Sequence, residues 1–114
     1  MEIISSRIQL KPGSVDRVRE WAAALNSRKE EVLETLRNEG IYLECAFLDH
    51  REDGDWLIYV IKAEDMAKGW EIFQNSTLPI DDYHKKFMAE VALQRENLEA
   101  LIQFDRHDEV YGWD

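Results

Sequence analysis

The stretch that decides the fold is residues 41–63, which read IYLECAFLDH (41–50), REDG (51–54) and DWLIYVIKA (55–63). The two outer segments are rich in aromatic and β-branched residues, which favour strands, and the polar segment between them contains Asp53 and Gly54. An Asp-Gly pair suits a two-residue turn because glycine readily adopts a positive φ. The sequence therefore predicts an antiparallel β-hairpin with Asp53-Gly54 as its turn.

This turn decides which side chains share a face of the hairpin, because successive residues of a strand point to opposite sides. The first face carries Glu44, Ala46, Leu48, His50, Leu57, Tyr59, Ile61 and Ala63. The second face carries Leu43, Cys45, Phe47, Trp56, Ile58 and Val60. The second set is bulkier and more uniformly apolar. We therefore expect it to pack against helices, which leaves the first set on the opposite side of the sheet.

The residues before the hairpin predict one strand and a long helical segment. Apolar and polar residues alternate over residues 2–10, as in a half-buried strand. Ser14 can cap a helix that continues to Gly40, a suitable C-cap residue. Ser27 and Glu30 can form a capping box within this segment, so we expect a break or kink close to Ser27.

The residues after the hairpin predict two helices and a final strand. The segment 64–76 carries apolar residues at helical spacing, and Pro79 separates it from a second helix that Asp81 can cap. The segment LEALIQFD (98–105) alternates apolar and polar residues, which favours a strand. A helix continuing through Leu101 is the alternative for this segment.

The resulting order of elements is β-α-β-β-α-β, the ferredoxin-like arrangement of the α+β class. We expect a single domain over residues 1–114, with a four-stranded antiparallel sheet covered by helices on one face. The other face is left bare in one chain, and a sheet with an apolar bare face commonly pairs with a copy of itself. The sequence thus predicts a homodimer whose two sheets close into a dimeric α/β barrel.

Charge and composition limit the partners. The formal net charge is −10, from 24 acidic and 14 basic residues, which opposes binding to nucleic acid and to anionic membranes. No apolar segment approaches the ~20 residues that span a bilayer, and the N-terminus shows no basic region before an apolar one. Cys45 is the only cysteine, so an intramolecular disulfide is excluded. We expect a cytoplasmic protein.

Three segments resemble a known superfamily: EWAAALNSRKEEVLETLRNEG (20–40), GDWLIYVIKAED (54–65) and PIDDYHKKFM (79–88). Together the chain is similar to the dimeric α/β-barrel superfamily, which includes antibiotic-biosynthesis-monooxygenase-like domains, and more narrowly to one family of uncharacterised bacterial proteins within it. The resemblance implies the ferredoxin-like fold and a dimer. Oxygenases, isomerases, dehalogenating enzymes and haem-binding enzymes share this superfamily, so the fold does not select an activity.

Glu44 and Tyr59 are the first candidates for a functional site, because both fall on the face assigned to the barrel interior. A carboxylate and a phenol within an apolar cavity are typical of a small-molecule site, and burial would raise the pKa of Glu44. Arg7 is expected on the same side, where it would orient a ligand or hold Glu44 charged. The alternative is structural: an ion pair between Glu44 and Arg7, with Tyr59 packing against it.

His84 is the third candidate. Asp81 and His84 lie three residues apart on a predicted helix and could both be metal ligands, but no second pair of this kind exists. The spacing of His50, His84 and His107 gives no metal motif, so we predict no metal. A histidine with an ordinary pKa near ~6.5 suits proton transfer at neutral pH. The alternative is a packing residue at a helix start.

These residues suggest a cofactor-independent enzyme that acts on a small organic molecule by acid/base chemistry. Glu44, Tyr59 and His84 would be catalytic, and Arg7, His50 and Trp70 would contact the ligand. The alternatives are a non-catalytic module that binds a small apolar molecule, and a structural dimer whose tail, EVYGWD (109–114), packs on its partner. No motif for binding a nucleotide or another cofactor is present.

Overall fold

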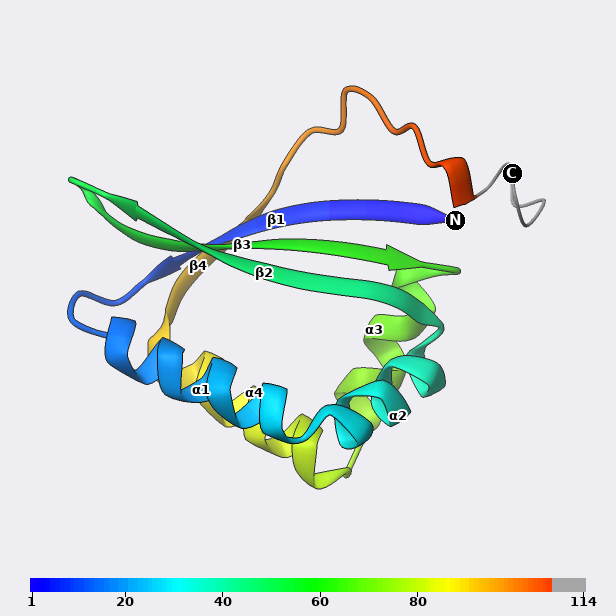
Figure 1. The fold of residues 1–114 in the computed structure, drawn as a ribbon, viewed down its shortest axis with the longest axis horizontal. Coiled ribbons are helices and arrows are strands. Elements are labelled where there is room, and N and C mark those ends of the chain that lie inside the picture. Colours follow the sequence, from blue (N-terminus) through cyan, green and yellow to red (C-terminus); the bar gives the residue numbers. More distant parts are fainter. Residues whose placement is uncertain (108–114) are drawn as a thin grey trace.

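The computed structural model describes residues 1–107 and has the α+β ferredoxin-like fold (Figure 1). Its antiparallel sheet has the strand order β2-β3-β1-β4, and the helices lie together on one side of it. The elements are β1 (Glu2–Leu10), α1 (Val15–Ser27), α2 (Lys29–Glu39), β2 (Ile41–Arg51), β3 (Gly54–Ala63), α3 (Met66–Asn75), α4 (Pro79–Val91) and β4 (Ala92–Asn97). This arrangement confirms the predicted fold class.

The long helical segment is broken as predicted. Helix α1 ends at Ser27 and α2 begins at Lys29, with Arg28 between them in a non-helical conformation. The capping box does not form, because the Ser27 hydroxyl donates to the carbonyl of Ala24. Gly40 ends α2 with a φ of 70°, a left-handed conformation that glycine adopts without strain.

The hairpin forms, but its turn lies one residue earlier than predicted. Arg51 is opposite Gly54, so Glu52 and Asp53 are the two turn residues. The predicted pairs are therefore shifted by two positions along one strand. A shift of two keeps each side chain on its predicted face, because the side-chain period of a strand is also two.

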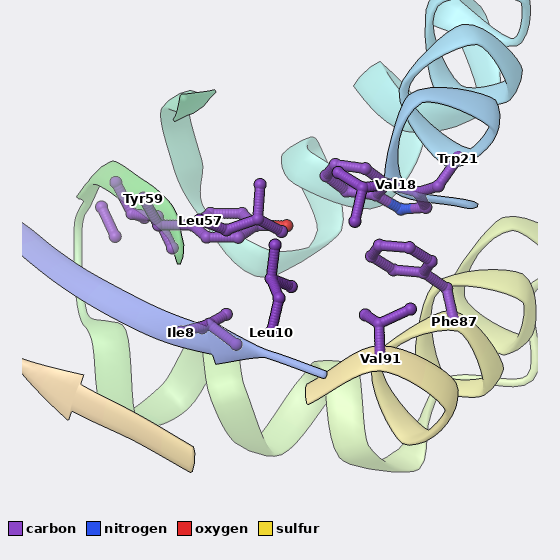
Figure 2. Packing of buried hydrophobic residues seen from close by; sticks show 10 residues of the cluster. Ile8, Leu10, Val18, Trp21, Leu57, Tyr59, Phe87 and Val91 are labelled. Carbon is purple, nitrogen blue, oxygen red and sulfur yellow. The ribbon is translucent and has the colours of Figure 1, made fainter. Parts of the chain in front are cut away.

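The assignment of these faces to the two sides of the sheet is wrong. Leu57, Tyr59 and Ala63 belong to the main buried cluster together with Trp21 and Phe87, which come from helices α1 and α4 (Figure 2). The first face therefore packs on the helices, and the bulkier second face is the open one. The helices themselves bring large rings: Trp21 and Phe87 stack with centroids 4.5 Å apart, so the strands opposite them need less bulk.

The last strand also differs from the prediction. Strand β4 covers Ala92–Asn97 and pairs with β1, whereas residues 98–105 form neither the predicted strand nor the alternative helix. They cross to the side of the sheet opposite the helices (Figure 1). Gln103 donates a hydrogen bond to the carbonyl of Ile3, and Asp105 forms an ion pair with Lys62. The predicted tail contact of residues 109–114 lies outside the described residues.

The open face keeps large apolar side chains in contact with solvent. Leu43 and Phe47 on β2 are 45% and 57% exposed, whereas Trp56 on β3 is covered by Arg7. A face of this kind is what the predicted second copy would cover, and the dimer stays a prediction. Among residues 1–107, no helix has both the length and the apolar character needed to cross a membrane.

Candidate functional site

A cavity of about 90 Å³ lies between the helix-covered face of the sheet and the helices. Its polar lining residues are Thr35, Glu39, Glu44, Tyr59, Asp81, His84 and Arg95. Its apolar wall includes Ile61, Trp70, Phe73 and Ile80. Glu44, Trp70 and Arg95 are exposed in the single chain, so the cavity meets solvent on their side. Convergent polar groups in an apolar cavity are typical of a small-molecule site.

Tyr59 lines this cavity and has a buried hydroxyl without a hydrogen-bond partner among residues 1–107. The residue as a whole is 3% exposed. Burial raises the pKa of Tyr59 well above its ordinary value, and the nearby Glu44 carboxylate adds to the effect. The phenol therefore stays protonated at neutral pH. A buried hydroxyl without a partner is costly, so this group is available to a ligand.

Glu44 lies beside Tyr59 because of the strand register. Glu44 is opposite Ile61 and Tyr59 is opposite Ala46, so the two are diagonal neighbours on one face. Although Glu44 as a whole residue is exposed on the edge strand β2, desolvation of its carboxylate by the surrounding cavity residues raises its pKa, and the positive charge of Arg95 partly offsets this. The guanidinium of Arg95 lies over the Tyr59 ring, 5.8 Å from its centroid, and donates to the Ser6 hydroxyl.

A hydrogen bond from Trp21 fixes the tautomer of the neutral His84 ring. The indole Nε1–H of Trp21 donates to Nδ1 of His84 at 3.1 Å. An indole can only donate, so Nδ1 carries no proton and the neutral ring carries its proton on Nε2. Burial lowers the pKa of His84 to about 4, despite the opposing effect of Asp81. The expected titration near neutrality is therefore wrong, and His84 is a neutral hydrogen-bond donor.

A second polar group of the cavity is built around Thr35. Its hydroxyl lies 2.6 Å from Oδ2 of Asp81 and 3.2 Å from Oε2 of Glu39. Asp81 also accepts a hydrogen bond from the Ser76 hydroxyl. The predicted capping role of Asp81 is wrong, because Leu78 occupies the N-cap position and the Asp81 side chain is buried.

Glu39 is the acid of this group with the clearest electrostatic perturbation. The residue is 6% exposed at the end of α2. Burial raises the pKa of Glu39 to about 7, and the charges of Asp81 and Glu44 act in the same direction, whereas Lys85 acts against them. A carboxylic acid with this pKa can gain or lose a proton near neutral pH.

Comparison with protein families assigns the chain. Residues 1–109 match the model of DUF6176, described as a family of unknown function. The chain belongs to this family. A comparison with curated proteins finds no match.

Two solved structures share the fold of this DUF6176 member. The crystal structure of an L-rhamnose mutarotase from Formosa agariphila aligns with a TM-score of 0.67 and 18% identity, covering 92% of this chain and 100% of that chain. The crystal structure of an antibiotic biosynthesis monooxygenase aligns with a TM-score of 0.55 and 16% identity, covering 90% and 100%. These similarities confirm the predicted ferredoxin-like fold.

Four of the six predicted site residues line the cavity, although it lies on the helix side of the sheet: Glu44, Tyr59, Trp70 and His84. Within residues 1–107, no hydrogen bond joins Glu44, Tyr59 and His84 to one another. The prediction that the Glu44 and Tyr59 side chains face the barrel interior is wrong, because the cavity lies on the helix side of the sheet. Glu44, Tyr59 and His84 nevertheless line one cavity.

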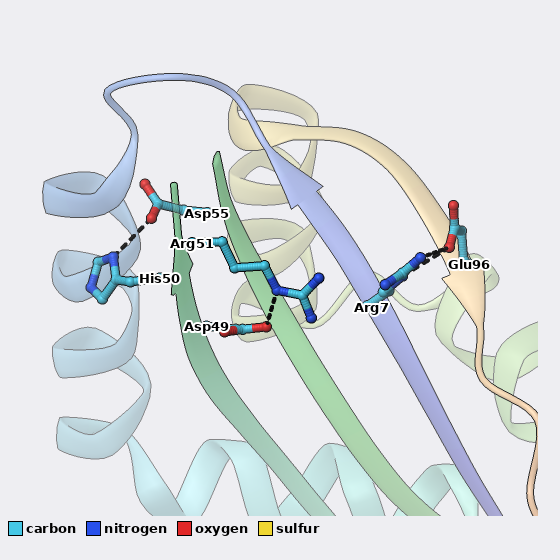
Figure 3. Close-up of polar contacts among 6 residues, drawn as sticks. All are labelled: Arg7, Asp49, His50, Arg51, Asp55 and Glu96. Atoms are coloured by element: carbon cyan, nitrogen blue, oxygen red, sulfur yellow. Dashed lines mark hydrogen bonds and ion pairs between the residues drawn. The ribbon is translucent and has the colours of Figure 1, made fainter. Parts of the chain in front are cut away.

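Arg7 and His50 are not among the residues that line the cavity. Figure 3 shows the polar contacts that they make instead. Arg7 is on the open face, where it pairs with Glu96 at 2.8 Å and lies over the ring of Trp56. The predicted contact of Arg7 with Glu44 is therefore wrong, and so is the structural ion pair. His50 lies near the tip of the hairpin, where its Nδ1 is 2.8 Å from Oδ1 of Asp55.

The sequence reasoning missed four polar members of the cavity: Thr35, Glu39, Asp81 as a lining group, and Arg95. Arg95 could have been found only with the correct position of β4. Thr35 and Glu39 are four residues apart and so share a face of α2, which is a usable signal. Among residues 1–107, no three His, Cys, Asp or Glu side chains are grouped as metal ligands.

Proposed function

We propose that this protein is a cofactor-independent enzyme that moves a proton on a small organic molecule bound between its sheet and its helices. The observation that carries the proposal is the buried hydroxyl of Tyr59, which has no hydrogen-bond partner among residues 1–107, on a residue that lines the same cavity as Glu44 and His84. A partner supplied by a substrate would remove the cost of this unpaired group.

The three groups have complementary roles in such a reaction. Glu44 is a carboxylate with a raised pKa, and it takes a proton from the substrate. The O–H of Tyr59 and the Nε2–H of His84 are neutral donors that can bind the oxygen on which negative charge develops. Small molecules with a carbonyl or hemiacetal group match this site. Removing a proton next to a carbonyl group and opening a hemiacetal ring both transfer a proton and place negative charge on oxygen.

The neighbours in fold support this class of substrate without deciding it. One carries the name of an L-rhamnose mutarotase and the other of an antibiotic biosynthesis monooxygenase. Opening a hemiacetal ring requires removal of a proton from a hydroxyl group and donation of a proton to the ring oxygen. Glu44 can take the hydroxyl proton and return it to the ring oxygen, while the neutral donors Tyr59 and His84 stabilise the charge on oxygen, so sugar anomers belong in the first test.

The working form in this proposal is a homodimer that buries the open face of the sheet. The exposed apolar residues Leu43 and Phe47 on β2 support a second copy at this position. The cavity lies on the other side of the sheet, so pairing of the open faces leaves it accessible.

The test uses the purified full-length chain in D₂O with a panel of reducing sugars, including L-rhamnose, and small ketones. Nuclear magnetic resonance follows the exchange between anomers and the replacement of C–H by deuterium. We expect one class of compound to react faster, and Glu44→Gln and Tyr59→Phe to lower that rate by roughly 10²-fold or more.

Glu34→Gln is the matched control, because Glu34 is an exposed acid on α2 that neither lines the cavity nor lies on the open face of the sheet, so its loss should leave the rate unchanged. Equal rates for Glu44→Gln and the unmodified chain would overturn the proposal. Binding of a copurified apolar molecule, seen by native mass spectrometry together with no acceleration for any compound, would favour the non-catalytic binding module instead.

A further inference from the structure

The hydroxyl of Thr35 lies between two buried carboxyl groups, and it has only one proton to donate. The oxygen is 2.6 Å from Oδ2 of Asp81 and 3.2 Å from Oε2 of Glu39. A hydroxyl that donates to an ionised carboxylate typically lies at 2.5–2.7 Å. The proton of Thr35 is therefore directed at Asp81, and Asp81 is the ionised member of the pair.

The remaining donors support this assignment. The Ser76 hydroxyl also donates to Oδ2 of Asp81, while its own oxygen accepts from the backbone N–H of Leu78. Asp81 thus accepts two hydroxyl protons, as an ionised carboxylate does. Since the proton of Thr35 is used, the contact with Glu39 is a hydrogen bond only when Glu39 carries a proton and donates it.

We propose that Glu39, Thr35 and Asp81 form a proton relay in the wall of the cavity. In the resting state Glu39 donates to the Thr35 oxygen and Thr35 donates to Asp81. When the Thr35 proton moves to Oδ2 of Asp81, the Glu39 proton moves to the Thr35 oxygen. The step leaves Asp81 neutral, Thr35 a hydroxyl as before, and Glu39 ionised, so one proton is transferred with no other reactant.

The relay borders the cavity in which a ligand is expected to bind. Asp81 and Glu39 line the same cavity as Tyr59, whose buried hydroxyl has no partner among residues 1–107. A proton that reaches Asp81 is therefore positioned for an oxygen atom of a bound molecule. This consequence rests on the proposed function, whereas the relay itself exists without a substrate.

The charges around Glu39 are consistent with a stored proton at neutral pH. Asp81 on α4 and Glu44 on β2 disfavour a third negative charge, and Lys85 on α4 is the opposing positive charge. Burial and the charges of Asp81 and Glu44 raise the pKa of Glu39 to about 7, against the opposing effects of the Thr35 contact and of Lys85. Glu39 can thus release its proton and recover it from water near physiological pH.

The test follows the side-chain carboxyl carbons by ¹³C nuclear magnetic resonance between pH 4 and 9, on the protein without any ligand. We expect the Glu39 signal to show a transition near pH 7, and the Asp81 signal to change with it because its hydrogen bond from Thr35 changes. In Glu39→Gln the amide donates to Thr35 permanently, so the transition of Asp81 near pH 7 disappears. In Thr35→Val this transition shrinks at least threefold, whereas Thr35→Ser keeps it.

Glu34→Gln is the matched control, because Glu34 is an exposed acid on the same helix and its loss should leave the Asp81 transition unchanged. The relay is wrong if Glu39 titrates near 4.5, or if the Asp81 transition persists in both Glu39→Gln and Thr35→Val. Either result leaves the rates of the Tyr59 and Glu44 variants unaffected, so the failure of the relay is separable from the failure of the proposed function.

Discussion

The two faces of the sheet differ in how far their side chains are buried within the single chain. The helix-covered face buries Leu57, Tyr59 and Ala63 against α1 and α4 and keeps a polar cavity beside them. The open face carries bulkier side chains, yet Leu43 and Phe47 remain exposed. Side-chain bulk therefore does not reveal which face is covered within the chain, because the open face of this sheet also carries large apolar side chains.

The polar groups of the two faces differ in the same way. On the open face, Arg7 and Glu96 form a partly exposed ion pair, which contributes little to stability. In the cavity, burial shifts the pKa values of Glu39, Glu44 and His84, so their protonation states depend on the fold. Substitutions should therefore have larger and more pH-dependent effects on the helix-covered side.

The largest effect is expected from Phe87→Ala. Phe87 is 0% exposed and stacks on Trp21, so truncation leaves a cavity and should lower the free energy of unfolding by about 3–5 kcal/mol. Urea denaturation followed by circular dichroism measures this loss. Phe104→Ala is the control, because Phe104 is 92% exposed and its loss should change the value by less than about 0.5 kcal/mol. Equal losses would contradict the contrast between the faces.

The next effect is the pH dependence introduced by Glu39. Its pKa of about 7 lies above the value of 4.5 for an exposed glutamate, so the folded state binds the proton more tightly. Glu39 therefore stabilises the fold below about pH 4.5, and this stabilisation is lost as the pH rises to 7.

Glu39→Gln removes this dependence. Relative to the unmodified chain, its free energy of unfolding should rise by the order of 2 kcal/mol between pH 4.5 and 7.5, after a discount for solvent screening. Urea denaturation at a series of pH values measures the difference. A constant difference across this range would show that Glu39 is ionised in the fold.

A smaller effect of opposite sign is expected from Tyr59→Phe. The substitution removes a buried hydroxyl that has no partner within the described part of the chain, so it should raise the free energy of unfolding by about 1 kcal/mol while lowering activity. Scanning calorimetry measures the stability. Tyr83→Phe is the control, since the Tyr83 hydroxyl accepts a hydrogen bond from Arg17 and its loss should not stabilise the protein. Destabilisation by Tyr59→Phe would mean that the hydroxyl has an unseen partner.

The smallest effect on the fold is expected from Phe47→Glu. Phe47 is on the open face, so the free energy of unfolding of a monomer should change by less than about 0.5 kcal/mol, while the dimer should dissociate about tenfold more readily. Sedimentation at micromolar concentration measures association. Ala23→Glu adds the same charge to an exposed position of α1 and should leave association intact. A monomeric unmodified chain would remove the basis of the paired-sheet model.

Most of the fold could be predicted from local sequence patterns. The hairpin, the break near Ser27 and the Gly40 cap could be predicted, because each depends on residues close in sequence. The last strand could not, because the alternating apolar residues after Asn97 imitate a strand while lying over the open face. The actual strand β4 is mostly polar and carries no clear alternation, so its position depends on pairing with β1.

The site was predictable where it depended on one hairpin and not where it depended on distant pairing. Glu44 and Tyr59 share a face by simple alternation, and this held despite the shifted turn. The side of Arg7 depends on the register between β1 and β3, which no turn connects, and Arg7 is opposite Ile58 on the open face. Burial of Asp81 and the orientation of His84 follow from the packing of α4 against α1 and α2.

The hydrogen bond from Trp21 to His84 gives the cavity an optical probe of its own. Indole emission responds to the charge of a group in direct contact with it, and Trp21 lies against a histidine that becomes charged only when the pH approaches 4. Trp70 lies at the mouth of the same cavity. The intrinsic fluorescence of the unlabelled chain should therefore report both the protonation of His84 and the arrival of a ligand.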